Sequence, residues 1–153
     1  MFESHKIAIF ASSIPSSIEN LTKVTQIFLQ SNYFTGQIPS LSKLKDLNLI
    51  DLRFNNLRAR IPDFLTNLTR LTKVYLSYNQ LTIGEFQSSN SLQILRLENN
   101  RLYGSIPKSI SNLVNLMELD ISSNDLSGIV EFDQSTKLKE LQKQSIIEHQ
   151  KKI

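Results

Sequence analysis

The chain has 153 residues and no cysteine. This absence excludes disulfide bridges, thiolate metal sites and cysteine nucleophiles together. Histidine is scarce as well, and His5 and His149 lie near the two ends of the chain. We therefore expect no metal site, no cofactor and no catalysis that depends on cysteine or histidine.

Long apolar runs are also missing. The longest run near the start, residues 7–11, is too short for the core of a signal peptide and far too short to span a bilayer. The sequence predicts no membrane-spanning segment, and a chain that is complete as written would remain in the cytoplasm.

A basic face is missing too, although the net charge is +3. The whole excess lies in residues 136–153, with five lysines against two glutamates, so residues 1–135 carry 12 basic and 12 acidic side chains. Nucleic-acid binding requires a basic patch on the folded body, which this distribution does not provide. We expect no nucleic-acid partner.

Proline is rare, and each of the four prolines, at positions 15, 39, 62 and 107, follows an isoleucine. Aligning the chain on these pairs reveals the template L-x-x-L-x-x-L-x-L-x-x-N-x-L-x-G-x-I-P, which can be written out five times. One asparagine marks each copy, and consecutive asparagines stand 23, 24, 21 and 24 residues apart. They are Asn32, Asn55, Asn79, Asn100 and Asn124. This regularity indicates a repeat protein.

The template predicts a solenoid. In each copy, L-x-L forms a short strand with inward leucines, and the remaining residues return the chain to the next, parallel strand. The fold class is α/β, with about five coils, a parallel β-sheet on the concave face, and irregular and short helical turns on the convex side. Residues 14–141 are assigned to the solenoid, 1–13 to a partial N-terminal coil or irregular lead-in, and 142–153 to a basic tail that is disordered or weakly helical.

Asparagine and glycine have predicted structural roles in this template. Each asparagine turns the chain inward, and its amide bonds backbone groups that the bend leaves unpaired. Glycine permits a backbone conformation closed to other residues. Ala59 replaces this glycine in the second copy, and residues 83–86 replace G-x-I-P in the third, after which the next coil has only 21 residues. A tighter convex side is expected there.

The segments NYFTGQIP, NRLYGSIP and SISNLVNLMELDISSNDLSG resemble plant-type leucine-rich repeats, and SGIVEFDQSTKLKELQ resembles the ectodomains of leucine-rich-repeat receptor-like proteins. The resemblance implies a fragment of a non-catalytic recognition module that binds a protein or peptide ligand, with a co-receptor as a further partner, in plant defence or developmental signalling. It also implies a place at the plasma membrane or outside the cell.

The outward side chains of successive strands form columns on the concave face. Aromatic residues and arginines gather there, as in protein and peptide recognition sites. The predicted contacts are Phe28, Arg53, Tyr75, Tyr78, Arg96 and Glu98. A purely structural interpretation remains open, in which the aromatics stabilise neighbouring strands and Arg96 pairs with Asp120.

Two alternative functions remain. The first, inhibition of a secreted cell-wall-degrading enzyme, would use the same face and resembles the polygalacturonase-inhibiting branch of the repeat family. The second is a glycoside hydrolase that uses Glu98 and Asp120, whose expected separation of about 8 Å suits an inverting mechanism. In addition, Asn20 and Asn67 begin N-glycosylation sequons on the outer side of their coils.

Overall fold

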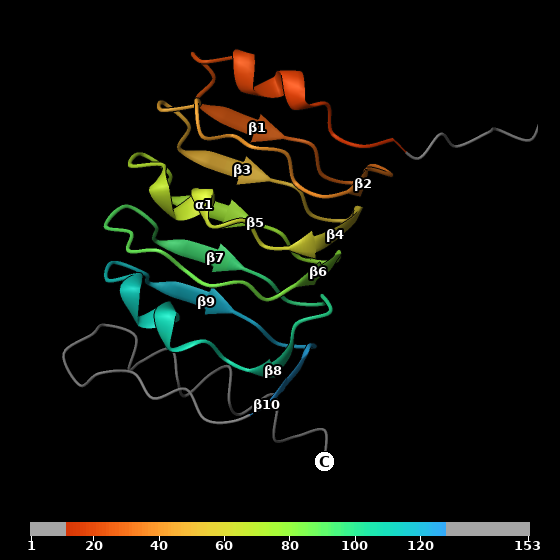
Figure 1. The fold of residues 1–153 in the computed structure, drawn as a ribbon, viewed down its shortest axis with the longest axis vertical. Helices are drawn as coiled ribbons and strands as arrows, with labels where there is room; N and C mark the ends of the chain where they lie inside the picture. Colours follow the sequence, from red (N-terminus) through yellow and green to blue (C-terminus); the bar gives the residue numbers. More distant parts are fainter. Residues whose placement is uncertain (1–11, 128–153) are drawn as a thin grey trace, which may run out of the picture.

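The computed structural model describes residues 12–127, which wind into a solenoid (Figure 1). One three-residue strand per coil joins a five-stranded parallel sheet, in sequence order. The strands are β1 (Gln26–Phe28), β3 (Leu49–Asp51), β5 (Lys73–Tyr75), β7 (Ile94–Arg96) and β9 (Glu118–Asp120). The predicted solenoid of about five coils is confirmed. The predicted tail, most of the lead-in and the end of the assigned solenoid lie outside the described residues.

The register of this sheet places the apolar centre of each strand beside the next. Ile27 pairs with Ile50, Ile50 with Val74, Val74 with Leu95 and Leu95 with Leu119. All five are buried. Because successive side chains of a strand alternate between faces, the residues on either side of each centre point away from the core. These outward side chains, with those of the turn residues that follow each strand, form the concave face.

Two smaller parallel sheets, which we call the lateral sheets, follow the asparagine turns and were not predicted. One contains β2 (Thr35–Gly36), β4 (Asn56–Arg60) and β6 (Gln80–Thr82), and the other contains β8 (Tyr103–Ser105) and β10 (Asp125–Ser127). The second to fifth coils each place one buried leucine in or just before these strands, Leu57, Leu81, Leu102 and Leu126, and the first coil has the half-buried Phe34 there. Strands of only two to five residues are too short for an alternating pattern to reveal.

Short helical turns return the chain toward the next strand, as predicted. They are η1 (Ser16–Asn20), α1 (Phe64–Asn67) and η2 (Lys108–Asn112) (Figure 1). Pro15 and Pro107 stand immediately before η1 and η2, with φ of −67° and −63°. Proline favours this position because its fixed φ suits the turn and its missing N–H is not needed there.

The segment that lacks G-x-I-P runs differently. Residues 83–91 contain no helix or strand, and Phe86 is a buried residue of this segment. A Cβ on Gly84 would meet the Ile61 carbonyl oxygen at 2.6 Å, so only glycine allows this close approach. Across the next coil, Phe86 N donates to Ser109 Oγ and Asn112 Nδ2 donates to Phe86 O. The break between the lateral sheets falls in this part of the chain.

Positive φ marks the glycine position of the template. Gly36 and Gly104 have φ of 76° and 80°, and Ala59 has φ of 81° at the equivalent position. An L-residue held there pays a steric cost between its Cβ and the backbone. The second coil therefore carries local strain that the first and fourth coils avoid.

The core is continuous along the described coils. Leu44, Leu68 and Leu113, at the first position of the template, are fully buried. Leu21, at the same position in the first coil, is 56% exposed. Among residues 12–127 no further coil packs on this side of the first coil, and burial in a solenoid depends on both neighbours.

Candidate recognition site

The asparagine ladder fixes the turn that follows each strand. Asn79 Nδ2 donates to the carbonyls of Leu52 and Leu76 at 2.9 and 3.1 Å, and its Oδ1 accepts the N–H of Leu57 at 3.0 Å. Each interior asparagine therefore bonds its own coil and the preceding one. Asn55, Asn100 and Asn124 repeat this pattern. Asn32 differs, because it is exposed and, among the described residues, its amide donates only to the carbonyls of Leu29 and Gln30.

The residue before each ladder asparagine is held in the left-handed region. These residues are Ser31, Phe54, Tyr78, Asn99 and Ser123, with φ between 52° and 57°. Asparagine tolerates this conformation, but bulky residues are rarely found there. The second and third coils nevertheless place aromatic residues at this position.

Phe54 and Tyr78 form an exposed stack. Their ring centroids lie 4.4 Å apart with an interplanar angle of 17°, and the residues are 49% and 46% exposed. Tyr78 was a predicted contact, whereas Phe54 was one of the aromatic residues expected on the concave face and was not named as a contact. Adjacent coils place both rings at the same template position, which is the sequence signal that identifies such a pair.

Arg53 is held by neighbours on the concave face. Its Nε and Nη2 donate to the two carboxylate oxygens of Asp51 at 2.9 and 2.6 Å, and its guanidinium lies 5.1 Å from the ring centroid of Tyr75. The hydrogen bond to Asp51 raises the pKa of the Arg53 guanidinium, burial opposes this, and the charges of Asp51 and Glu98 add to it. Asp51 is only 3% exposed, although its position in the strand predicts an outward side chain.

Arg96 is paired as well, but with a different residue from the one the structural interpretation named. Its Nε donates to Glu118, whereas Asp120 accepts the N–H and hydroxyl of Ser122 at 3.0 and 2.7 Å. The expected pairing of Arg96 with Asp120 is therefore wrong. Arg96 is level with Asp120 in the register, but the longer side chain of Glu118 reaches it along the strand. The hydrogen bond to Glu118 raises the pKa of Arg96.

Glu98 is a charged residue of the concave face, and its carboxylate is not fully hydrogen-bonded. Its Oε2 is buried and has no hydrogen-bond partner, and the same is true of the hydroxyl of Ser77. These are the two buried side-chain polar atoms without partners among the described residues. Sequence analysis selected Glu98 but not Ser77, because a serine between leucines carries no distinctive signal.

The structure brings five of the six predicted contacts together on β5, β7 and the turns that follow β3, β5 and β7. Phe28, the sixth, lies on the outermost strand β1, where it is 55% exposed and level with Asp51. No group of three or more histidine, cysteine or acidic side chains in residues 12–127 could hold a metal ion. In the glycosidase alternative Asp120 would act as one of the two catalytic carboxylates, and in the structure its carboxylate accepts two hydrogen bonds from Ser122.

The two sequons lie away from this face. Asn20 ends η1 and Asn67 ends α1, and both residues are exposed, as are Thr22 and Thr69. Both sequons therefore stand on helical turns of the return side of their coils. Within the described part of the chain, no helix is long and apolar enough to cross a membrane.

Comparison with known families agrees with the repeat fold that the asparagine ladder and the strand register indicate. Residues 90–142 match the family described as leucine rich repeat. The receptor kinase HAESA from Arabidopsis, solved with the peptide hormone IDA and the co-receptor SERK1, has a TM-score of 0.72 and 33% identity. The match covers 78% of this chain and 21% of that one. The chain is a plant-type leucine-rich-repeat protein.

Two further similar structures are described as proteins of different function. The ectodomain of GASSHO1/SCHENGEN3 from Arabidopsis thaliana, in complex with CASPARIAN STRIP INTEGRITY FACTOR 2, has a TM-score of 0.70 and 32% identity over 79% of this chain and 15% of that one. A plant ice-binding protein has a TM-score of 0.70 and 30% identity over 78% and 40%. The leucine-rich-repeat chain thus spans less than half the length of these relatives. None of the curated proteins compared matches it.

Proposed function

We propose that the leucine-rich-repeat chain is a non-catalytic recognition module that binds a peptide, or an extended segment of a protein, on its concave face. The observation that carries this proposal is the exposed stack of Phe54 and Tyr78. Aromatic residues at two adjacent left-handed positions are unusual, because bulky residues are rarely found in this conformation, which asparagine tolerates. Exposed aromatic surface of this kind is typical of binding hot spots.

The surroundings of the stack support the same function. The Arg53 guanidinium lies between Asp51 and Tyr75, which fixes its position and leaves its side chain 35% exposed. A rigid face with apolar rings at its centre and charged groups around them suits the anatomy of a protein interface. HAESA was solved with a bound peptide hormone, and its match covers 78% of the residues of the present chain.

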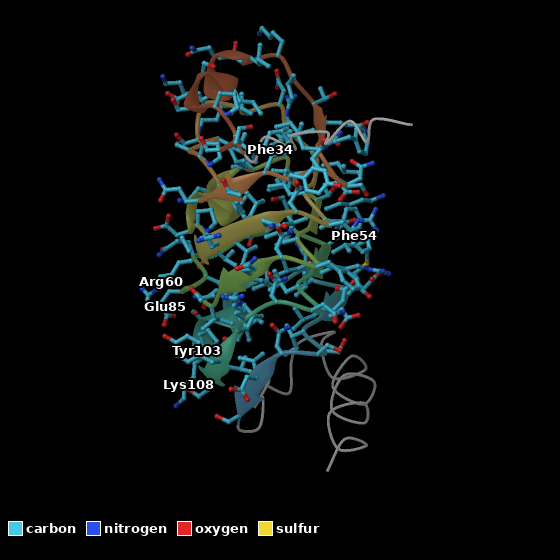
Figure 2. The ribbon with its side chains drawn as sticks, turned by 90° about the vertical axis from the view of Figure 1, so that its right-hand side faces the viewer. Phe34, Phe54, Arg60, Glu85, Tyr103 and Lys108 are labelled. Carbon is cyan, nitrogen blue, oxygen red and sulfur yellow. The ribbon has the colours of Figure 1, made fainter. Side chains whose placement is uncertain are left out.

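The test is selection of a random dodecapeptide display library on the purified protein, followed by affinity measurement with two tyrosine variants. Tyr78→Ala should weaken binding of the selected peptides at least tenfold. Tyr103→Ala is the matched control, because Tyr103 is 65% exposed on β8 of a lateral sheet. Figure 2 labels Phe54 and Tyr103 on opposite sides of the solenoid. Equal affinity for both variants would contradict the proposal.

We also propose an extracellular location, supported by the exposure of both sequons. Secretion of the chain from plant cells behind an added signal peptide should attach glycans at Asn20 and Asn67. Treatment with a glycosidase should then increase gel mobility, and Asn20→Gln with Asn67→Gln should abolish the change. An unglycosylated secreted chain would remove this support.

A further inference from the structure

We propose that the concave face holds a subsite for a basic side chain of the ligand, a lysine or an arginine, formed by Glu98, Ser77 and the stack of Phe54 and Tyr78. This inference rests on the proposed function and specifies the chemistry of the ligand. The carboxylate and hydroxyl supply acceptors for the cation, and the rings supply an apolar wall.

The first observation is that the two buried groups without partners are neighbours. Tyr75 is level with Arg96 in the register of β5 and β7, and the pairing continues past both strands, because Tyr78 N donates to Glu98 O at 3.0 Å. Ser77 is therefore level with Glu98. Ser77 is fully buried, so its unpaired hydroxyl is enclosed by protein. A buried polar group without a partner is unfavourable, and a donor that reached it would recover the lost hydrogen bond.

The second observation is the charge balance of the face, which has three cationic and four anionic residues. They are Arg53, Lys73 and Arg96 against Asp51, Glu98, Glu118 and Asp120. Both arginines are already bonded to carboxylates, Arg53 to Asp51 and Arg96 to Glu118. Lys73 stands four residues before Ser77, about 13 Å along the strand direction. Glu98 makes no ion pair with any described residue. An incoming cation therefore meets a carboxylate without a direct ion-pair partner, although the charge of Glu98 already acts on Arg53 and Arg96.

An anionic ligand group fits this place poorly. To bind it, Arg53 would have to release the nearly buried carboxylate of Asp51, leaving that charge without its bidentate partner. Arg96 would likewise have to leave Glu118. A cation leaves both of these ion pairs intact; to reach the enclosed oxygens of Ser77 and Glu98 it has to shift the side chains that cover them.

The third observation is the apolar wall. Tyr78 follows Ser77 in the chain, so the exposed stack of Phe54 and Tyr78 adjoins the two unpaired acceptors. Lysine and arginine carry aliphatic stems that lie along apolar surface while the charged head stays at a polar site. The face of a tyrosine ring also attracts a cation electrostatically. The combination favours a basic residue over a small inorganic cation, for which one carboxylate is a poor site.

The test uses dodecapeptides selected by display on the wild-type protein and discarded if they also bind the Phe54→Ala, Tyr78→Ala double variant. The remaining peptides should be rich in lysine or arginine. Replacing the critical basic residue with norleucine should weaken binding to the wild type about 10- to 100-fold. Glu98→Gln should cause a similar loss for the original peptide, but little further loss for the norleucine peptide.

Asp125→Asn is the matched control, because it removes one negative charge from β10, which lies in a lateral sheet. It should bind the original peptide with unchanged affinity. Urea unfolding of both variants checks that each is folded. If the peptides depend on the stack but lack basic residues, or if Glu98→Gln binds them normally, the subsite is refuted while the proposed function stands. If no peptide depends on the stack, the proposed function fails and this inference fails with it.

Discussion

Replacement of Asn79 by alanine should destabilise the protein far more than the same replacement of Asn32, although both occupy the ladder position of the template. Asn79 is 8% exposed, whereas Asn32 is exposed to solvent. The Asn79 amide joins two coils, because it bonds the carbonyls of Leu52 and Leu76 and the N–H of Leu57. Within residues 12–127, the Asn32 amide bonds only carbonyls of its own turn.

The magnitude follows from these bonds. Three well-formed hydrogen bonds at about 1 kcal/mol each give about 3 kcal/mol for Asn79→Ala, and the orphaned N–H of Leu57 can raise this to about 4 kcal/mol. Water replaces the exposed bonds of Asn32, so Asn32→Ala should cost less than about 1 kcal/mol.

The assay is urea unfolding followed by far-ultraviolet circular dichroism. With a slope of about 1.5 kcal/mol per molar urea, Asn79→Ala should lower the unfolding midpoint by about 2 M, and Asn32→Ala by less than about 0.7 M. If the two midpoints fall within about 0.3 M of each other, bonding between coils is not the source of the stabilisation by the ladder.

Three other substitutions test local features of the fold by the same assay. Ala59→Gly should stabilise the protein by about 0.5–1 kcal/mol, because it relieves a φ of 81° at some cost in unfolded-state entropy; a lower midpoint would refute the strain. Gly84→Ala should destabilise it by about 1–3 kcal/mol, since the new Cβ would lie 2.6 Å from the Ile61 carbonyl oxygen. An unchanged unfolding midpoint would mean that the backbone of this segment shifts to accommodate the Cβ at little cost. Ser77→Ala should raise stability by about 1 kcal/mol by removing a buried unpaired hydroxyl, yet weaken peptide binding; destabilisation would indicate that the hydroxyl has a partner in solution.

The repeat spacing predicts much of the scaffold. The apolar pattern identifies the centre of every strand in the main sheet, such as Ile50 and Val74, because an apolar residue that must face the core recurs once in each coil. The lateral sheets escaped prediction, because their strands are only two to five residues long and mostly polar. The role of Gly84 also escaped it, since the conflict involves a carbonyl more than 20 residues away in sequence.

The pairing of charged side chains on the concave face could not be read from the columns. Arg96 has Asp120 level with it and Glu118 two residues earlier on the same strand, and the choice depends on side-chain length and on the competing bonds from Ser122. Burial of Asp51 depends on how Arg53 folds over it. These are properties of long side chains in three dimensions, which a linear pattern does not determine.

The central claim is that recognition takes place on the concave face beside the aromatic stack. It is tested most directly by backbone amide NMR of the isotopically labelled protein, titrated with a display-selected peptide. The account predicts that the largest chemical-shift changes fall in residues 51–54, 73–78 and 94–99. Changes confined to the lateral sheets, residues 56–60, 80–82 and 103–105, would contradict it.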